Sequence, residues 1–322
     1  MLFRSIFHSK SLRMDRERLL KLGYFYDVST PKLTKSTANG GVDITFHVSE
    51  KKVNRVDLGL EQEEEKFVSF LQTKYHHGLI KSDQLSAKMQ VGVLDDKLNL
   101  TSYSVRYHQP WLFNQSPISF TADVWTELNQ EYFSQTSVNG LGDLIKNKRQ
   151  GWDVIFGFPI KEDWLHFSLK LKDEVVSPRD GETLFERYRL NSVSGILSYQ
   201  TIDDWTNPTQ GTYWQFKFEK GGNLGLYQLA GLDFSKVDLN AASFFSLTDT
   251  SVLGLHANMG IFRPHGSESQ TFEAEGYEIG GASTIRGYKD DPPLTGFRKM
   301  VFNVEYRQQL SPSFQEIGRA HV

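Results

Sequence analysis

Few residues in this chain have the types and the spacing that a catalytic or metal-binding site requires. The sequence contains no cysteine, so it offers no thiol nucleophile, thiolate metal site or disulfide. Tyr75, His76 and His77 could suggest a metal, but no third ligand stands at a recognisable spacing, and we interpret them as a solvated turn. No elbow motif places a serine, histidine and acid together. The glycines around Gly280 lack the Lys-Ser or Lys-Thr of a phosphate loop. We therefore expect no enzyme, no metal and no cofactor.

One arginine lies in an unusual setting. Arg286 follows Ile285 and precedes Gly287 and Tyr288, within a connection over residues 272–297 that is rich in glycine and proline. Loops longer than ~12–15 residues are uncommon unless they are functional or disordered. This loop could lie on the surface, or it could fold back so that Arg286 forms a bidentate pair with a carboxylate. Glu305 on the following strand is the candidate partner, and the residues alone leave both interpretations open.

The elements around this loop are predicted by a clean two-residue alternation. From residue 53 onward, apolar and polar side chains alternate in segments that reach or nearly reach the ~9–11 residues needed to cross a bilayer as a tilted strand. No stretch approaches the ~20 apolar residues of a membrane-spanning helix. About twelve strands are expected, centred near residues 56, 71, 89, 104, 122, 155, 168, 196, 216, 236, 257 and 305.

The predicted connections differ in length on the two sides of this sheet. Long joints follow odd strands, at 129–150, 173–189 and 263–298, whereas joints after even strands stay short, at 158–163 and 203–211. Outer-membrane barrels have this asymmetry, so the pattern predicts an all-β, transmembrane antiparallel barrel. The long loop then follows the eleventh strand on the outer side, and Glu305 faces the lumen. A large soluble sandwich or jelly roll, for example a carbohydrate-binding one, also alternates and is the alternative.

The first fifty residues have a different pattern. They predict a short helix at 15–22 and two strands at 25–33 and 42–48, joined by a polar turn, which makes a small α+β unit. The first residues show no apolar export segment, so we expect the chain to lack its natural N-terminus. The aromatic content of 13% suits the interfacial girdles of a barrel, and the net charge of −3 makes nucleic acid an unexpected partner.

The stretch from Gly280 to Tyr288 resembles the signature of the sixth extracellular loop in the outer-membrane protein assembly factor superfamily, the BamA-like proteins. Weaker matches occur in the same order along the chain. They are 22–28 with 42–50 (the last POTRA domain), 107–113 (the turn after the fourth strand), 197–204 with Asn207, Pro208 and Gly211 (the turn after the eighth strand), and 301–305 (the strand after the loop).

This resemblance implies a sixteen-stranded barrel in the bacterial outer membrane, with POTRA domains in the periplasm. It implies that Arg286 lies in the lumen and contacts Glu305. It also implies insertion of β-barrel proteins through a seam at the first strand, with seam residues Val53, Val56, Leu58 and Leu60. Expected partners are unfolded outer-membrane proteins, periplasmic accessory lipoproteins and the lipid bilayer. The alternative is a two-partner-secretion pore, which has two POTRA domains and a plug helix where an insertase usually has several POTRA domains.

The resemblance also shows where this chain departs from the family. We expect residues 1–51 to be part of the last POTRA domain and residues 52–316 to be an incomplete barrel with about twelve of sixteen strands. Residues 317–322 read as a non-native tail. A second acidic partner of the signature arginine lies on a later strand that we do not find. The sequence does not set the number of POTRA domains or the accessory subunits.

Overall fold

The structure is a computed structural model, and the chain divides into two compact units, Met1–Arg55 and Val56–Val322, which are considered separately below. Within the described part of the chain, no helix has the length and apolar character to cross a membrane. The residues that the structure describes are 12, 16, 19, 25–35, 41–50, 54–63, 66–76, 83–94, 97–112, 118–133, 143–161, 164–179, 186–205, 207–266, 275–280, 284–285, 294–311 and 314–321.

The first unit contains an interrupted hairpin. Phe25–Val28 (β1) pairs antiparallel with Val48–Glu50 (β4), and Lys32–Lys35 (β2) pairs with Val42–Thr45 (β3). The two strands expected at 25–33 and 42–48 are therefore each broken into two. Pro31 lies at the break and cannot donate to a ladder. There the backbone N–H of Ser29 donates to the His47 carbonyl at 2.8 Å, and the His47 N–H donates to Ser29 Oγ at 2.9 Å, which joins the two short ladders.

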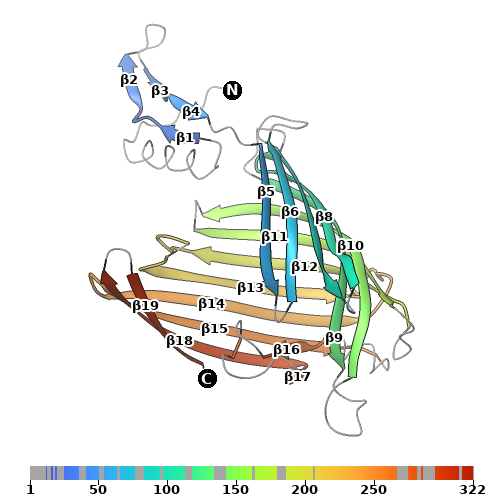
Figure 1. The fold of residues 1–322 in the computed structure, drawn as a ribbon. Helices are drawn as coiled ribbons and strands as arrows, with labels where there is room; N and C mark the ends of the chain where they lie inside the picture. Colours follow the sequence, from blue (N-terminus) through green and yellow to red (C-terminus); the bar gives the residue numbers. More distant parts are fainter. Residues whose placement is uncertain are drawn as a thin grey trace. The chain divides into compact units, whose positions relative to one another are not determined.

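The second unit is built on one antiparallel sheet in which thirteen described strands follow one another in chain order. Within the described part of this unit, β16 and β17, which lie in the connection between β15 and β18, form a separate pair. Figure 1 shows the large sheet as a curved and strongly twisted surface running from β5 to β19. Its strands are β5 (Arg55–Glu63), β6 (Lys66–His76), β7 (Gln84–Leu94), β8 (Lys97–Gln109), β9 (Ser119–Phe133), β10 (Asp143–Lys161), β11 (Leu165–Pro178), β12 (Tyr188–Gln200), β13 (Gly211–Gly221), β14 (Phe234–Thr248), β15 (Ser251–Pro264), β18 (Arg298–Ser311) and β19 (Phe314–His321).

This sheet confirms the predicted all-β antiparallel class. The twelve expected strands correspond to β5–β15 and β18. The thirteenth, β19, was not counted, because residues 317–322 were read as a non-native tail; the backbone of Ile317–His321 pairs with β18 from Arg307 to Asn303. That these residues are non-native stays a prediction. Among the described strands, the order ends at β5 on one side and at β19 on the other.

Several strands continue further than alternation alone predicted. The expected loop over residues 129–150 is largely strand, because β9 and β10 stay paired as far as Phe133 and Asp143. β11 and β12 likewise remain paired to Val176 and Tyr188, inside the expected loop over 173–189. The alternation is hard to see there because polar residues occupy both faces, as expected where strands project beyond an apolar band. Of the two joints expected to be short, the one between β10 and β11 holds residues 162–164, whereas the one between β12 and β13 holds residues 201–210. The joints at 134–142 and 179–187, expected to be long, are no longer than the second of these.

The two faces of the sheet differ in polarity. On one face, here called the apolar face, large hydrophobic side chains are solvent-exposed on strand after strand. A patch of this extent on a protein surface marks contact with a membrane or another protein. The opposite, polar face carries the charged residues described below. Representative exposed residues of the apolar face are Leu71, Leu85, Met89, Val105, Val124, Trp152, Phe216, Leu255, Ile261, Met300 and Phe302.

Aromatic rings gather on the apolar face near the short turns. Trp164, at the β10–β11 turn, contacts Tyr199 edge-on with ring centroids 5.6 Å apart, and Tyr199 stacks on Trp214 at 5.7 Å. Phe120 and Phe156 continue the row, 5.4 Å apart. Girdles of aromatic residues at the membrane interfaces are typical of transmembrane barrels, so this row supports the assignment of the apolar face to lipid.

Candidate functional site

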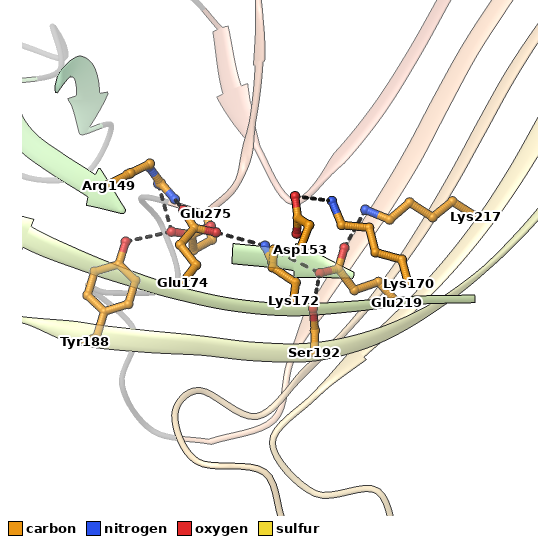
Figure 2. A network of polar contacts seen from close by, with 10 residues as sticks. All are labelled: Arg149, Asp153, Lys170, Lys172, Glu174, Tyr188, Ser192, Lys217, Glu219 and Glu275. Atoms are coloured by element: carbon orange, nitrogen blue, oxygen red, sulfur yellow. Dashed lines mark hydrogen bonds and ion pairs between the residues drawn. The ribbon is translucent and has the colours of Figure 1, made fainter. Parts of the chain in front are cut away.

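A network of charged residues covers the polar face at the centre of the sheet (Figure 2). It is built on β10–β13, because every second residue of each strand points to this face. One member, Glu275, comes from the connection between β15 and β18 and lies just before β16 (Tyr277–Ile279). The members are Arg149, Asp153, Lys170, Lys172, Glu174, Tyr188, Ser192, Lys217, Glu219 and Glu275.

Glu275 attaches the start of the long connection to the sheet. Arg149 spans two carboxylates, with Nη2 2.8 Å from Glu275 Oε1 and Nη1 2.8 Å from Glu174 Oε1. The Tyr188 hydroxyl also donates to Glu275 Oε1, at 2.6 Å. The Arg149 side chain is 12% exposed and that of Glu174 is 5% exposed. The contact is therefore largely shielded from water, where charge-assisted hydrogen bonds are strongest.

The remaining charges of the network alternate in sign. Lys172 lies 2.9 Å from Glu174 and 3.5 Å from Glu219, and Lys217 lies 2.6 Å from Glu219. Ser192 donates a further hydrogen bond to Glu219 at 2.6 Å. Removing one cation would leave a largely buried carboxylate with fewer partners, which is costly where water is excluded. Within the described part of the chain, no three histidine or acidic side chains gather as a metal site requires.

Tyr277 is a second attachment point of the long connection. β16 pairs with Leu294–Gly296 (β17), and we call this hairpin the loop stem. The Tyr277 side chain is 6% exposed, and its hydroxyl donates to Asp238 Oδ1 at 2.7 Å. The ammonium groups of Lys236 and Lys299 lie 4.6 and 4.7 Å from the ring centroid, within the range of cation–π attraction. The ring is thus held by its hydroxyl group and by two nearby cations.

Gly260 provides the space for this ring. A Cβ atom added at Gly260 would lie 2.4 Å from Tyr277 Cζ, closer than real Cβ contacts come. The backbone N–H of Phe262 also donates to the Phe297 carbonyl at 2.8 Å, which ties the end of the stem to β15. An apolar cluster surrounds the stem and consists of Val176, Leu190, Leu232, Phe234, Phe262 and Tyr277, with Tyr188 and Phe297 packed against it.

The signature motif itself lies mostly outside the described residues. Arg286, Gly287 and Tyr288 are not described, whereas Ile285 is half-buried. Just before it, the Gly280 N–H donates to Thr284 Oγ1 at 2.8 Å, and the Thr284 hydroxyl donates back to the Gly280 carbonyl at 2.5 Å.

Glu305, the expected partner of Arg286, lies on β18 and is 2% exposed. Its position opposite Gly254 of β15 puts it on the polar face. Arg307, two residues further along the same face, donates from Nε to Glu305 Oε1. The contact of Glu305 with Arg286 stays a prediction.

The expected seam residues lie at one edge of the sheet. Val56, Leu58 and Leu60 alternate along β5, with 66%, 79% and 79% of their surfaces exposed, and Val53 lies outside the described residues. β5 is the last described strand on its side of the sheet. The structure therefore brings these residues together on one edge, and it places them apart from the charged network on β10–β13.

Sequence reasoning missed Glu275, Tyr277 and the network around Arg149. The alternation of β10–β13 contained part of the signal, because it already put Lys170 and Lys172 on one face. No periodicity runs through residues 265–297, so nothing in the sequence distinguished Tyr277 from the other aromatics of the connection.

Comparison with solved structures supports the fold. BamA from Haemophilus ducreyi lacking POTRA domains 1–3 matches with a TM-score of 0.66 and 13% identity, covering 98% of this chain and 64% of that one. CdiB from Acinetobacter baumannii matches with a TM-score of 0.61 and 15% identity, covering 92% and 55%. CdiB from Escherichia coli matches with a TM-score of 0.64 and 13% identity, covering 93% and 56%. The chain thus spans about half to two thirds of the length of these structures.

The family is established by the sequence. Residues 81–320 match the Omp85 superfamily domain, which is well over half of the 322 residues. This match confirms the family resemblance found in the motifs. The chain therefore belongs to the Omp85 superfamily, whose barrels are proteins of the bacterial outer membrane.

Proposed function

We propose that this protein assembles and inserts unfolded β-barrel proteins into the outer membrane, and that β5 is the strand on which they pair. The observation that carries the proposal is the match of residues 81–320 to the Omp85 superfamily domain, supported by the likeness to BamA. β5 is the first described strand of the sheet and carries the exposed, outward row Val56, Leu58 and Leu60. An edge strand presents a row of backbone N–H and C=O groups on which another chain can pair. The exposed apolar row lets this pairing take place within lipid.

Backbone hydrogen bonding supplies the driving force in this proposal. An unfolded strand entering the bilayer must satisfy each of its N–H and C=O groups, and every unsatisfied group costs several kcal/mol. Pairing with β5 satisfies one side of the incoming strand, and the next substrate strand satisfies the other. The reaction requires no covalent step, so we expect neither a catalytic residue nor a cofactor.

The loop and the first unit have supporting roles in the proposal. The loop stem lies on the polar face through Glu275 and Tyr277. We expect Arg286, further along the same connection, to pair with Glu305 and to fix the loop to the barrel wall. The first unit, with its interrupted hairpin, would be part of a periplasmic POTRA domain. It would receive substrates and contact accessory lipoproteins.

A second candidate is the two-partner-secretion pore, in which the polar face would line the path of an unfolded polypeptide. It is favoured by the likeness to two CdiB structures, whose TM-scores of 0.61 and 0.64 are close to that of BamA. The two candidates differ in the number of substrates that they serve.

Depletion of the full-length protein from its own cells tests the proposal. An insertase serves many clients, so we expect the abundance of many unrelated outer-membrane barrels to fall together, as measured by quantitative proteomics of outer-membrane fractions. Depletion of an unrelated outer-membrane barrel is the control for general envelope stress. Loss of a single secreted protein, with the other barrels unchanged, would instead identify the secretion pore.

A further inference from the structure

The turn between β12 and β13 folds across several strands of the sheet. The structure describes residues 201–205 and 207–210 of this turn, which we call the strap. Arg307 of β18 donates from Nη1 to the Pro208 carbonyl at 3.2 Å and to Asn207 Oδ1 at 3.3 Å. Since β14 and β15 separate β13 from β18 in the sheet, the strap contacts a strand three places away from β13.

The side chains that the strap contacts belong to the polar face. Phe244 of β14 lies opposite Gly254 of β15, and so does Glu305 of β18, which puts Phe244 on the polar face. Ser246 follows Phe244 by two residues and shares its orientation. Its hydroxyl donates to the Thr209 carbonyl in the strap at 3.0 Å. Since β14 ends two residues after Ser246, the strap lies against the polar face at the ends of the strands.

Arg307 holds the strap by charged hydrogen bonds. Its Nε donates to Glu305 Oε1, so that one guanidinium joins a carboxylate of its own strand to the strap. The guanidinium carbon lies 5.3 Å from the centroid of the Phe244 ring, in cation–π range. The side chains of Arg307 and Glu305 are only 10% and 2% exposed, and charge-assisted hydrogen bonds are strong where water is excluded. A guanidinium serves several acceptors from one rigid plane, which a lysine ammonium cannot reproduce.

The strap also has an ordered internal structure. Asp203 Oδ1 accepts hydrogen bonds from the backbone N–H groups of Thr209 at 3.0 Å and of Gln210 at 3.2 Å. Desolvation alone would raise the pKa of Asp203, but its hydrogen bonds outweigh it and lower the pKa to about 2. At its end, Gly211 has a φ of 110°, and a Cβ there would lie 2.4 Å from the Thr201 carbonyl oxygen, so only glycine fits. The strap therefore leaves the sheet in a defined direction and keeps its shape at physiological pH.

We propose that the strap obstructs this end of the polar lumen and that Arg307 is the latch that holds it there. In a barrel whose polar face lines the lumen, a segment lying against that face at the strand ends narrows the opening. A latched strap would limit the leak of ions through a wet interior while the protein is idle. The inference rests on the proposed function only for a closed barrel around a polar lumen, and it applies equally to an insertase and to a secretion pore.

A single thiol can report the position of the strap, because the sequence has no cysteine. Pro208→Cys puts the thiol at a buried position and keeps the backbone carbonyl that Arg307 contacts. The protein is full-length, with any cysteine outside this sequence replaced by serine. Arg307→Ala should raise the rate of maleimide labelling by about tenfold, as expected for loss of a hydrogen bond to a charged group. Arg307→Lys should also raise it. Arg298→Ala and Arg298→Lys, at the opposite end of the same strand, are the matched controls and should leave it unchanged.

Ion conductance in planar lipid bilayers then tests whether the strap obstructs the lumen. Arg307→Lys should raise the mean conductance of the purified full-length protein several-fold over that of Arg298→Lys. Ser246→Ala removes a different contact of the strap and leaves the pair between Arg307 and Glu305 intact, so it should raise the conductance by a smaller factor.

Folding is followed separately, by the heat-dependent shift in gel mobility that a closed barrel shows. If Arg307→Ala fails to fold, Arg307→Lys and Ser246→Ala decide the question. Labelling rates equal to those of the Arg298 controls would overturn the latch, and faster labelling with unchanged conductance would overturn the obstruction. Neither measurement depends on a substrate, so a raised conductance in a protein that inserts no barrels would refute the proposed function and leave the strap supported.

Discussion

Gly260→Ala should release the loop stem from the sheet without unfolding the sheet. The added methyl would overlap the Tyr277 ring, with Cβ 2.4 Å from Cζ. The ring must therefore leave its position beside Lys236 and Lys299 and lose its hydrogen bond to Asp238. Loss of a buried aromatic side chain costs about 3–5 kcal/mol. We expect maleimide labelling of Ile279→Cys in the stem to accelerate by roughly 100- to 4,000-fold, with the barrel still showing its heat-dependent gel shift.

A double-mutant cycle separates this mechanism from a general disturbance of β15. Tyr277→Ala alone should raise the labelling rate as much as Gly260→Ala does. In the Tyr277→Ala background, Gly260→Ala should then have almost no further effect, because the group with which its methyl overlaps is gone. Additive effects of the two changes would show that Gly260 does not act through Tyr277.

Arg149→Met should lower the thermal stability of the barrel more than the same substitution of an exposed arginine does. It removes the cation shared by Glu174 and Glu275 and leaves Glu174, with 5% of its side chain exposed, dependent on Lys172 alone. Breaking a buried pair in this way costs about 3–5 kcal/mol, and we expect the lower end because Lys172 remains. The measurement is the temperature at which the folded gel form disappears.

The matched control for this substitution is on β12, two strands away from β10 in the sheet. Arg189 also pairs with an aspartate, Asp173, but its side chain is 49% exposed. Arg189→Met should cost no more than about 1 kcal/mol, as exposed ion pairs do. Adding Glu174→Gln to Arg149→Met should restore part of the lost stability, because it removes the buried charge. Equal transition temperatures for Arg149→Met and Arg189→Met would contradict a structural role for the network.

The strands of the sheet could be predicted because each residue had one of two environments. Side chains such as Leu85 and Met89 lie on the apolar face, whereas Lys170 and Lys172 lie on the polar face. Apolar and polar residues therefore alternate along each strand with a period of two. The contrast weakens where strands extend beyond the apolar band, so the end of β9 was placed too early and the start of β10 too late. In the first unit, Pro31 could have indicated the break between β1 and β2, since it removes a backbone donor.

The candidate site was only partly predictable, for a physical reason. Glu305 could be assigned to the polar face from its phase within a strand. The docking of Tyr277 depends on Gly260 from a different element and on lysines from two further strands, β14 and β18. These contacts bring together residues that no local pattern connects. Arg307 was passed over in the same way, because the turn that it contacts lies about a hundred positions earlier in the chain.

Cross-linking at β5 during insertion tests the central claim most directly. The full-length protein carrying Leu58→Cys is placed in liposomes and given an unfolded barrel substrate with one cysteine in its last strand. Val124→Cys on β9 is the control, because it is also an exposed apolar-face position but lies inside the sheet. We predict a disulfide to the substrate from position 58 and none from position 124. Efficient insertion with equal cross-linking at both positions, or with none at position 58, would contradict templating by β5.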